Sequence, residues 1–146
     1  MKILVGYVRT PEGEAALARA IQEASLRAAE LVVVHSERGG ERDETERSIA
    51  DSKELAAVRA KLEAAGVHHS VRELVRGKEP GDDLVDFANE IGAELIVLGL
   101  RRRSPVGKLV LGSTTQDVLL GADCPVLTVK ADNSHLSPLG RSEDDH

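Results

Sequence analysis

The residues of this chain with the clearest capacity for chemistry lie in one segment, residues 99–115. Gly99 follows an apolar run, and Gly112 precedes Ser113, Thr114 and Thr115. A glycine lets the backbone turn sharply and approach a ligand without a clash from Cβ. Small residues with unpaired backbone N–H groups at the start of a helix favour bound phosphate. The segment therefore predicts a site for a phosphorylated ligand.

Positive charge in the same segment supports this interpretation. Arg101, Arg102, Arg103 and Lys108 lie in a chain whose formal net charge is −6. Arginine binds phosphate oxygens through its fork of N–H donors. The Gly-Lys pair at 107–108 does not form a P-loop, because no glycine lies five residues before it and Leu109 replaces the magnesium-binding Ser or Thr. The alternative interpretation of the segment is a solvated basic loop.

Hydrophobic patterning predicts the elements that position this segment. Continuous Val, Ile and Leu runs are typical of parallel strands covered on both faces, and apolar stripes at helical spacing lie between them. The expected strands are residues 3–7, 31–35, 70–75, 95–98 and 125–129, of which the third is the most polar. The expected helices are residues 11–28, 55–65, 80–91 and 113–120.

Alternation of strands and helices predicts an α/β fold with a single open five-stranded parallel sheet and helices on both faces. The polar third strand belongs on an edge, which gives the strand order 3-2-1-4-5. The connections then reverse direction between the first and fourth strands, and ligands of open α/β sheets bind at such a switch point. We expect the loops at residues 7–10 and 99–112 to line it.

Composition restricts the classes of function. Tyr7 and Phe87 are the only aromatic residues, and the chain is acidic, which argues against binding of nucleic acid. No stretch has the length of a transmembrane helix, and the start of the chain does not resemble a signal peptide, so we expect no membrane partner and a cytoplasmic location. We expect one domain at residues 1–130 and a disordered tail at residues 131–146.

With these motifs in view, residues 2–130 resemble the universal stress protein family. Its nucleotide-binding members carry a glycine, two residues, a second glycine, nine residues, and a third glycine followed by Ser or Thr. Gly99 matches the first position, and Gly112 with Ser113 matches the last. The closing sequence ADCPVLTVK is also similar to the end of the family's domain.

The resemblance implies that the chain holds ATP or AMP, with Mg²⁺ as an accompanying ion. No nucleophile–base pair or carboxylate dyad lies near the expected loops, so we expect no catalytic residue. The implied nucleotide-binding residues are Gly6, Tyr7, Val8, Ser36 and Leu98 around the adenosine, and Gly99, Arg101, Arg102, Gly112, Ser113, Thr114 and Thr115 around the phosphates.

Two positions depart from the family's pattern. Arg102 stands where the family has its middle glycine, and Val8 stands where nucleotide-binding members often have an Asp that contacts the adenosine. Arg102 either obstructs a backbone contact with phosphate or replaces it with its own donors. Val8 removes a polar contact.

Three functions remain open: a nucleotide-binding regulatory protein, a nucleotide-free member of the same fold that acts through protein interaction, and a slow ATPase. The arginines and hydroxyls favour the first, Val8 favours the second, and the lack of a group to activate water counts against the third. The apolar strand near residues 125–130 should form an exposed sheet edge and pair with a second copy to give a homodimer. The alternative is that the tail folds back over this edge.

Overall fold

The structure is a computed structural model that describes residues 1–37, 44–75, 79–100 and 111–131, without the side chains of 36, 37, 44–52 and 75. Strands and helices alternate along the chain. The elements are β1 (Lys2–Gly6), α1 (Pro11–Arg27), β2 (Glu30–Glu37), α2 (Glu44–Ala65), β3 (His69–Val75), α3 (Pro80–Ile91), β4 (Leu95–Leu100), α4 (Ser113–Gly121) and β5 (Val126–Lys130).

All strand pairs are parallel, and the sheet has the order β3-β2-β1-β4-β5. This confirms the predicted fold and strand order. The central strands are buried on both faces because their side chains are apolar throughout: Ile3, Leu4 and Val5 of β1 are fully buried. The polar third strand lies on an edge, as its composition predicted.

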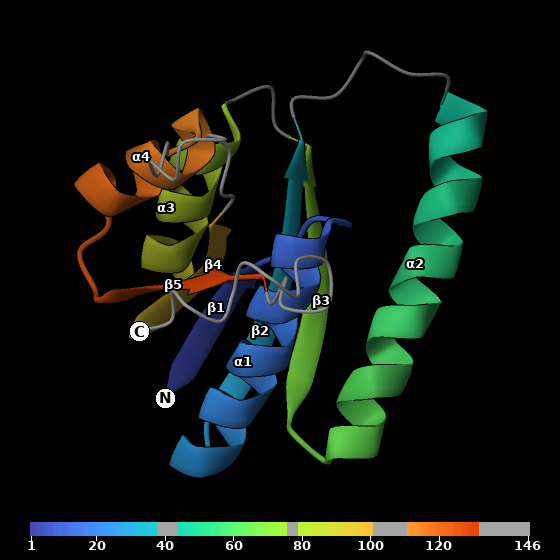
Figure 1. Cartoon of the computed structure of the whole chain (residues 1–146), viewed down its shortest axis with the longest axis horizontal. Coiled ribbons are helices and arrows are strands. Elements are labelled where there is room, and N and C mark those ends of the chain that lie inside the picture. Colours follow the sequence, from blue (N-terminus) through green and yellow to red (C-terminus); the bar gives the residue numbers. More distant parts are fainter. Residues whose placement is uncertain (38–43, 76–78, 101–110, 132–146) are drawn as a thin grey trace, which may run out of the picture.

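The helices cover the two faces of the sheet in pairs (Figure 1). Leu17 of α1 and Leu62 of α2 pack with Val5 and Leu31 in one core cluster. Phe87 of α3 and Val118 of α4 belong to a second cluster on the other face. Alternating residues of each central strand therefore contribute to different cores.

Element boundaries differ from the sequence-based expectation in two informative places. Helix α2 begins at Glu44, ahead of the apolar stripe at residues 55–65, and its charged first half carries no such stripe. Strand β4 continues through Gly99 to Leu100, where a loop was expected to begin after residue 98.

Tyr7, which follows β1, joins the β1–α1 loop to α2. Its side chain is 5% exposed, and its hydroxyl donates to Glu14 Oε2 at 2.5 Å and also contacts Glu54 Oε2 of α2. Lys61 Nζ of α2 lies 2.8 Å from Glu14 Oε1, and Arg9 Nη1 lies 3.7 Å from Glu54 Oε1. Two carboxylates and two cations thus surround one buried phenol.

These contacts shift the protonation equilibria of the group. Burial, together with the hydrogen bonds to both carboxylates, raises the pKa of Tyr7 far above its ordinary range, so the phenol stays protonated. Burial alone would raise the pKa of Glu14, but the hydrogen bonds from Lys61 and Tyr7 outweigh it and lower that pKa.

Helix α4 is positioned by a close approach to α3. A Cβ added to Gly81 of α3 would lie 2.6 Å from Cβ of Asp117 and 2.9 Å from the carbonyl oxygen of Thr114. Only a residue without a side chain therefore allows this separation of the two helices.

We predict that Gly81→Ala destabilises the protein by about 1–3 kcal/mol, because the added methyl group must push α4 away. Gly121→Ala is the matched control in the same interface, since its Cβ would meet Val85 at an ordinary 3.5 Å. Urea denaturation of the two variants measures the difference. Equal stability of both variants would contradict the packing argument.

We predict that Tyr7→Phe lowers stability at pH 7 by about 1–3 kcal/mol, the scale of a hydrogen bond to a charged acceptor. The pKa of Glu14 is depressed in the folded state, so its stabilising contribution is present above its ordinary pKa of 4.5 and is lost as pH falls through the folded value. The difference between wild type and Tyr7→Phe should therefore shrink in acid. Urea denaturation at pH 7 and at acid pH measures it, and a constant difference would refute the role of ionised Glu14. Lys61→Ala, which removes an exposed ion pair, should cost less than Tyr7→Phe.

Candidate functional site

A cavity of about 310 Å³ opens at the carboxyl ends of β1 and β4, where the strand order reverses. Its volume lies at the lower end of the range for small-molecule sites. Its lining residues come from β1 and the loop after it, β2, β4 and the first turns of α1, α3 and α4. They are Gly6, Tyr7, Val8, Glu12, Val34, Pro80, Leu84, Leu98, Gly99, Gly112, Ser113, Thr114 and Thr115.

The cavity brings together most of the residues singled out from the sequence. These are Gly6, Tyr7, Val8, Leu98, Gly99, Gly112, Ser113, Thr114 and Thr115. Ser36 lies in β2, paired with Leu74 of β3, and its side chain lies outside the described part of the structure. Arg101 and Arg102 lie outside the described residues.

Four lining residues were not foreseen: Glu12, Val34, Pro80 and Leu84. A signal existed for Val34, because it ends an apolar run and pairs in register with Gly6 at the switch point. Pro80 and Leu84 had no local signal, since they reach the cavity only through the packing of α3 against α4.

Helix α4 begins at the cavity without a side-chain cap. Gly112 is the N-cap residue, with extended backbone (φ −72°, ψ 165°), and its carbonyl oxygen accepts from the N–H of Gln116 at 3.0 Å. The N–H groups of the first turn, from Ser113 to Thr115, therefore have no acceptor within the helix. No acidic residue lies in this turn to offset the positive end of the helix dipole.

Helix α1 also begins at the carboxyl ends of the strands, but its first turn is capped. The Thr10 side chain accepts from the N–H of Gly13 at 3.0 Å, and Glu12 and Glu14 supply negative charge in the first turn. Of these two helix starts at the cavity, α4 is therefore the one with donors available to an anion.

The two glycines of the motif have different roles. A Cβ on Gly112 would meet no atom of the described residues within 4 Å, so this glycine leaves space beside the α4 amides. A Cβ on Gly99 would lie 2.3 Å from the carbonyl oxygen of Glu12. Gly99 was expected to turn the chain toward a ligand; instead it continues β4 and admits the first turn of α1.

The remaining wall is apolar. Val34, Leu84 and Leu98 line it above Gly6, whose Cβ would lie 2.8 Å from Cδ2 of Leu98. His35, next along β2, has Nδ1 3.1 Å from the carbonyl oxygen of Tyr7, which ties the end of β2 to the β1–α1 loop. An apolar wall opposite a row of hydrogen-bond donors complements a ligand with a flat apolar part and an anionic part.

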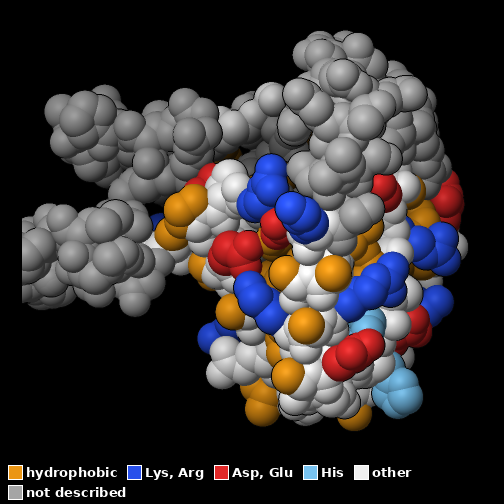
Figure 2. Space-filling model, turned by 90° about the vertical axis from the view of Figure 1, so that its right-hand side faces the viewer, with side chains coloured by type: hydrophobic (Ala, Val, Ile, Leu, Met, Phe, Trp, Pro, Cys, Tyr) orange, Lys and Arg blue, Asp and Glu red, His pale blue; other side chains and the backbone are white. Residues whose placement is uncertain are grey.

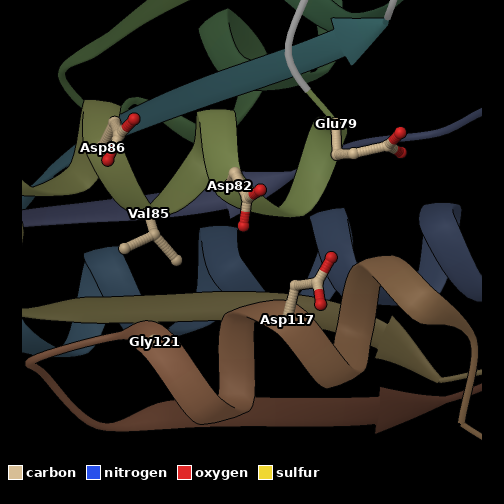
Figure 3. Close-up of a pocket in the computed structure, with 6 residues that line it drawn as sticks. All are labelled: Glu79, Asp82, Val85, Asp86, Asp117 and Gly121. Carbon is tan, nitrogen blue, oxygen red and sulfur yellow. The ribbon is translucent and has the colours of Figure 1, made fainter.

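A second hollow, of about 410 Å³, lies between α3 and α4 and is acidic. Figure 3 shows Asp82 of α3 and Asp117 of α4 directed toward one another across it. Glu79 and Asp86 add further negative charge. This charge repels phosphate, so the cavity at the switch point is the better candidate for an anionic ligand.

The surface on the α2 side carries mixed charge. In Figure 2, Lys and Arg side chains alternate with acidic groups and small apolar areas over the described part of this face.

Among the described residues, no three His, Cys, Asp or Glu side chains come together as a group that could hold a metal ion. Within the same residues, no helix combines the length and the apolar character needed to cross a membrane.

Comparisons with known proteins agree with this architecture. The model of the universal stress protein family matches residues 1–130. A universal stress protein from Mycolicibacterium smegmatis is 39% identical over 128 residues, which is 88% of this chain and 96% of that protein.

Solved structures give the same assignment. A universal stress protein from Archaeoglobus fulgidus is 40% identical, with a TM-score of 0.76, and the match covers 88% of this chain and 97% of that one. A universal stress protein structure from the same organism, in complex with dAMP, is 35% identical, with a TM-score of 0.70 and coverage of 88% and 96%. The sheet order, the site at its switch point and the match along residues 1–130 agree, and the chain belongs to the universal stress protein family.

Proposed function

We propose that this protein binds an adenine nucleotide, ATP or AMP, at the switch point between β1 and β4 and acts as a regulatory protein in the cytoplasm. The start of α4, whose first amides have no acceptor within the helix and whose three hydroxyls lie in the wall of the cavity, is the observation that carries the proposal. The dAMP complex of a relative that is 35% identical supports an adenine nucleotide as the ligand class.

The residues in the cavity fit the two parts of such a ligand. The base would lie against the apolar wall formed by Val34, Leu84 and Leu98, beside Gly6, Tyr7 and Val8. The phosphates would accept hydrogen bonds from the first turn of α4, beside Gly112. Arg101 and Arg102, in the segment of the sequence that precedes α4, would add positive charge. Mg²⁺ would be held chiefly by the phosphates and water.

A regulatory role is favoured over catalysis by the side chains that line the cavity. Among the lining residues that the structure describes, Glu12 and Tyr7 are the only titratable ones, and the Tyr7 hydroxyl already contacts two carboxylates. The Ser and Thr hydroxyls at the start of α4 have no His beside them in this lining to act as a base.

The edge strand supports a second part of the proposal, a homodimer. β5 ends the sheet beyond β4, and its residues Val126, Leu127 and Val129 are apolar and only partly buried. Such an edge pairs readily with another strand. Two copies could join their β5 strands around a two-fold axis.

We predict that the wild-type protein binds ATP or AMP and that Gly112→Val weakens this binding by more than about tenfold. The isopropyl group would fill open space beside the α4 amides, so folding should be little affected. Ser113→Ala should be milder, because it removes one hydroxyl and keeps every backbone donor.

Isothermal titration calorimetry with ATP, ADP and AMP measures these affinities, and thermal unfolding checks that both variants fold. An absence of heat and of thermal stabilisation for wild type at about 1 mM nucleotide would refute the proposed function. Normal affinity of a folded Gly112→Val protein would place the phosphates elsewhere.

We predict that the full chain sediments as a dimer and that Thr128→Pro sediments as a monomer. The N–H of Ile96 in β4 donates to the Pro125 carbonyl oxygen at 3.1 Å, so by alternation the backbone groups of Thr128 face the open edge. Proline there removes an outward donor and leaves the β4–β5 hydrogen bonds in place.

Analytical ultracentrifugation of both proteins, and of a chain ending at Lys130, tests the dimer. A dimeric Thr128→Pro protein would move the interface elsewhere. A wild type that becomes dimeric only after removal of residues 131–146 would show instead that the tail covers the edge.

A further inference from the structure

Glu12 is a carboxylate in the cavity wall that has no partner among the residues that the structure describes. It lies in the first turn of α1, is half-buried and lines the cavity with the start of α4. It makes no hydrogen bond or ion pair with another described residue, whereas Glu14, two residues later, is bound by Tyr7 and Lys61. A half-buried carboxylate without a partner favours a ligand that brings hydrogen-bond donors.

The chemistry of the proposed ligand limits what Glu12 could bind. Phosphate oxygens are negatively charged acceptors, so a carboxylate repels them. A nucleotide carries its donors on the sugar hydroxyls and on the amino group of the base. Glu12 must therefore bind one of these groups or oppose binding altogether.

The position of Glu12 favours the sugar. An ideal Cβ on Gly99 would lie 3.1 Å from Cβ of Glu12, so Glu12 packs on the α1 face of β4. Leu98, one residue earlier, points to the opposite face with Val34 and Leu84 of the apolar wall. Glu12 thus lies across the end of β4 from the wall proposed for the base. In a nucleotide, the ribose lies between base and phosphates, so its hydroxyls come next beyond that wall.

We propose that the Glu12 carboxylate accepts hydrogen bonds from the ribose hydroxyls and makes the site selective for ribonucleotides over 2′-deoxyribonucleotides. This inference rests on the proposed function, because it names a contact within the same site. A carboxylate suits this role, since its two oxygens can each accept a hydrogen bond from one hydroxyl of a vicinal pair.

The competing explanation is that Glu12 serves only the helix. Carboxylates in the first turn stabilise a helix through its dipole, and α1 carries two of them. Under this explanation, removal of Glu12 changes stability and general charge but leaves discrimination between sugars unchanged.

Calorimetric titration of the full chain with ATP and with 2′-deoxy-ATP separates these explanations. Wild type should bind ATP at least about tenfold more tightly than 2′-deoxy-ATP, the scale of one charge-assisted hydrogen bond. Glu12→Ala should weaken ATP by a similar factor and affect 2′-deoxy-ATP less, so that the ratio of the two affinities approaches one. Glu12→Gln keeps one acceptor oxygen and should give an intermediate ratio.

Asp82→Ala is the matched control, because it removes a first-turn carboxylate from α3, outside the lining of this cavity. Its ratio of affinities should equal that of wild type. An unchanged ratio in Glu12→Ala, or equal tightening of both nucleotides by loss of negative charge, would overturn the inference and leave the proposed function intact. If wild type binds neither nucleotide, the proposed function fails and this inference fails with it.

Discussion

The approach of α1 to β4 at Gly99 is the contact on which the site depends. The carbonyl oxygen of Glu12 occupies the volume that a side chain at this position would need. This contact holds the first turn of α1 beside the carboxyl end of β4, and it fixes the distance between the loop after β1 and the start of α4. A larger residue at position 99 would separate two walls of the cavity, even though no strand would lose its hydrogen bonds.

A second close approach that depends on a glycine positions the wall of the cavity formed by α3 and α4. Gly81 allows α3 to lie against α4 near Thr114, and this brings Pro80 and Leu84 to the cavity and keeps the uncapped helix start in place. The starts of α1 and α4 at the cavity differ in charge: α1 has its own cap and acidic residues, while α4 has neither a side-chain cap nor an acidic residue in its first turn. The site is therefore polarised by the placement of helix ends, with few charged side chains in the lining that the structure describes.

Sequence patterns were sufficient for the fold and for much of the cavity, for reasons that are local. Apolar runs such as that of β1 identify buried parallel strands, and the polar third strand identifies an edge, which together fix the strand order. Residues at strand ends then fall at the switch point. Pro80 and Leu84 were not predicted, because only the tertiary contact at Gly81 brings them to the cavity. Glu12 was not predicted, because a first-turn carboxylate is an ordinary feature of helices. Gly99 lines the cavity, and the structure adds a role that the sequence did not reveal, since its missing side chain makes room for the first turn of α1.

Tyr7 gives the protein a built-in optical probe. The chain contains one tyrosine and no tryptophan, so its tyrosine emission arises from a single ring at the edge of the cavity. The phenol is hydrogen-bonded to Glu14 and Glu54, and a carboxylate that accepts the phenolic proton in the excited state quenches tyrosine fluorescence. The folded protein should therefore emit weakly, and any event that separates the phenol from both carboxylates, Glu14 of α1 and Glu54 of α2, should make it brighter. Tyrosine emission then reports on these two contacts without a label.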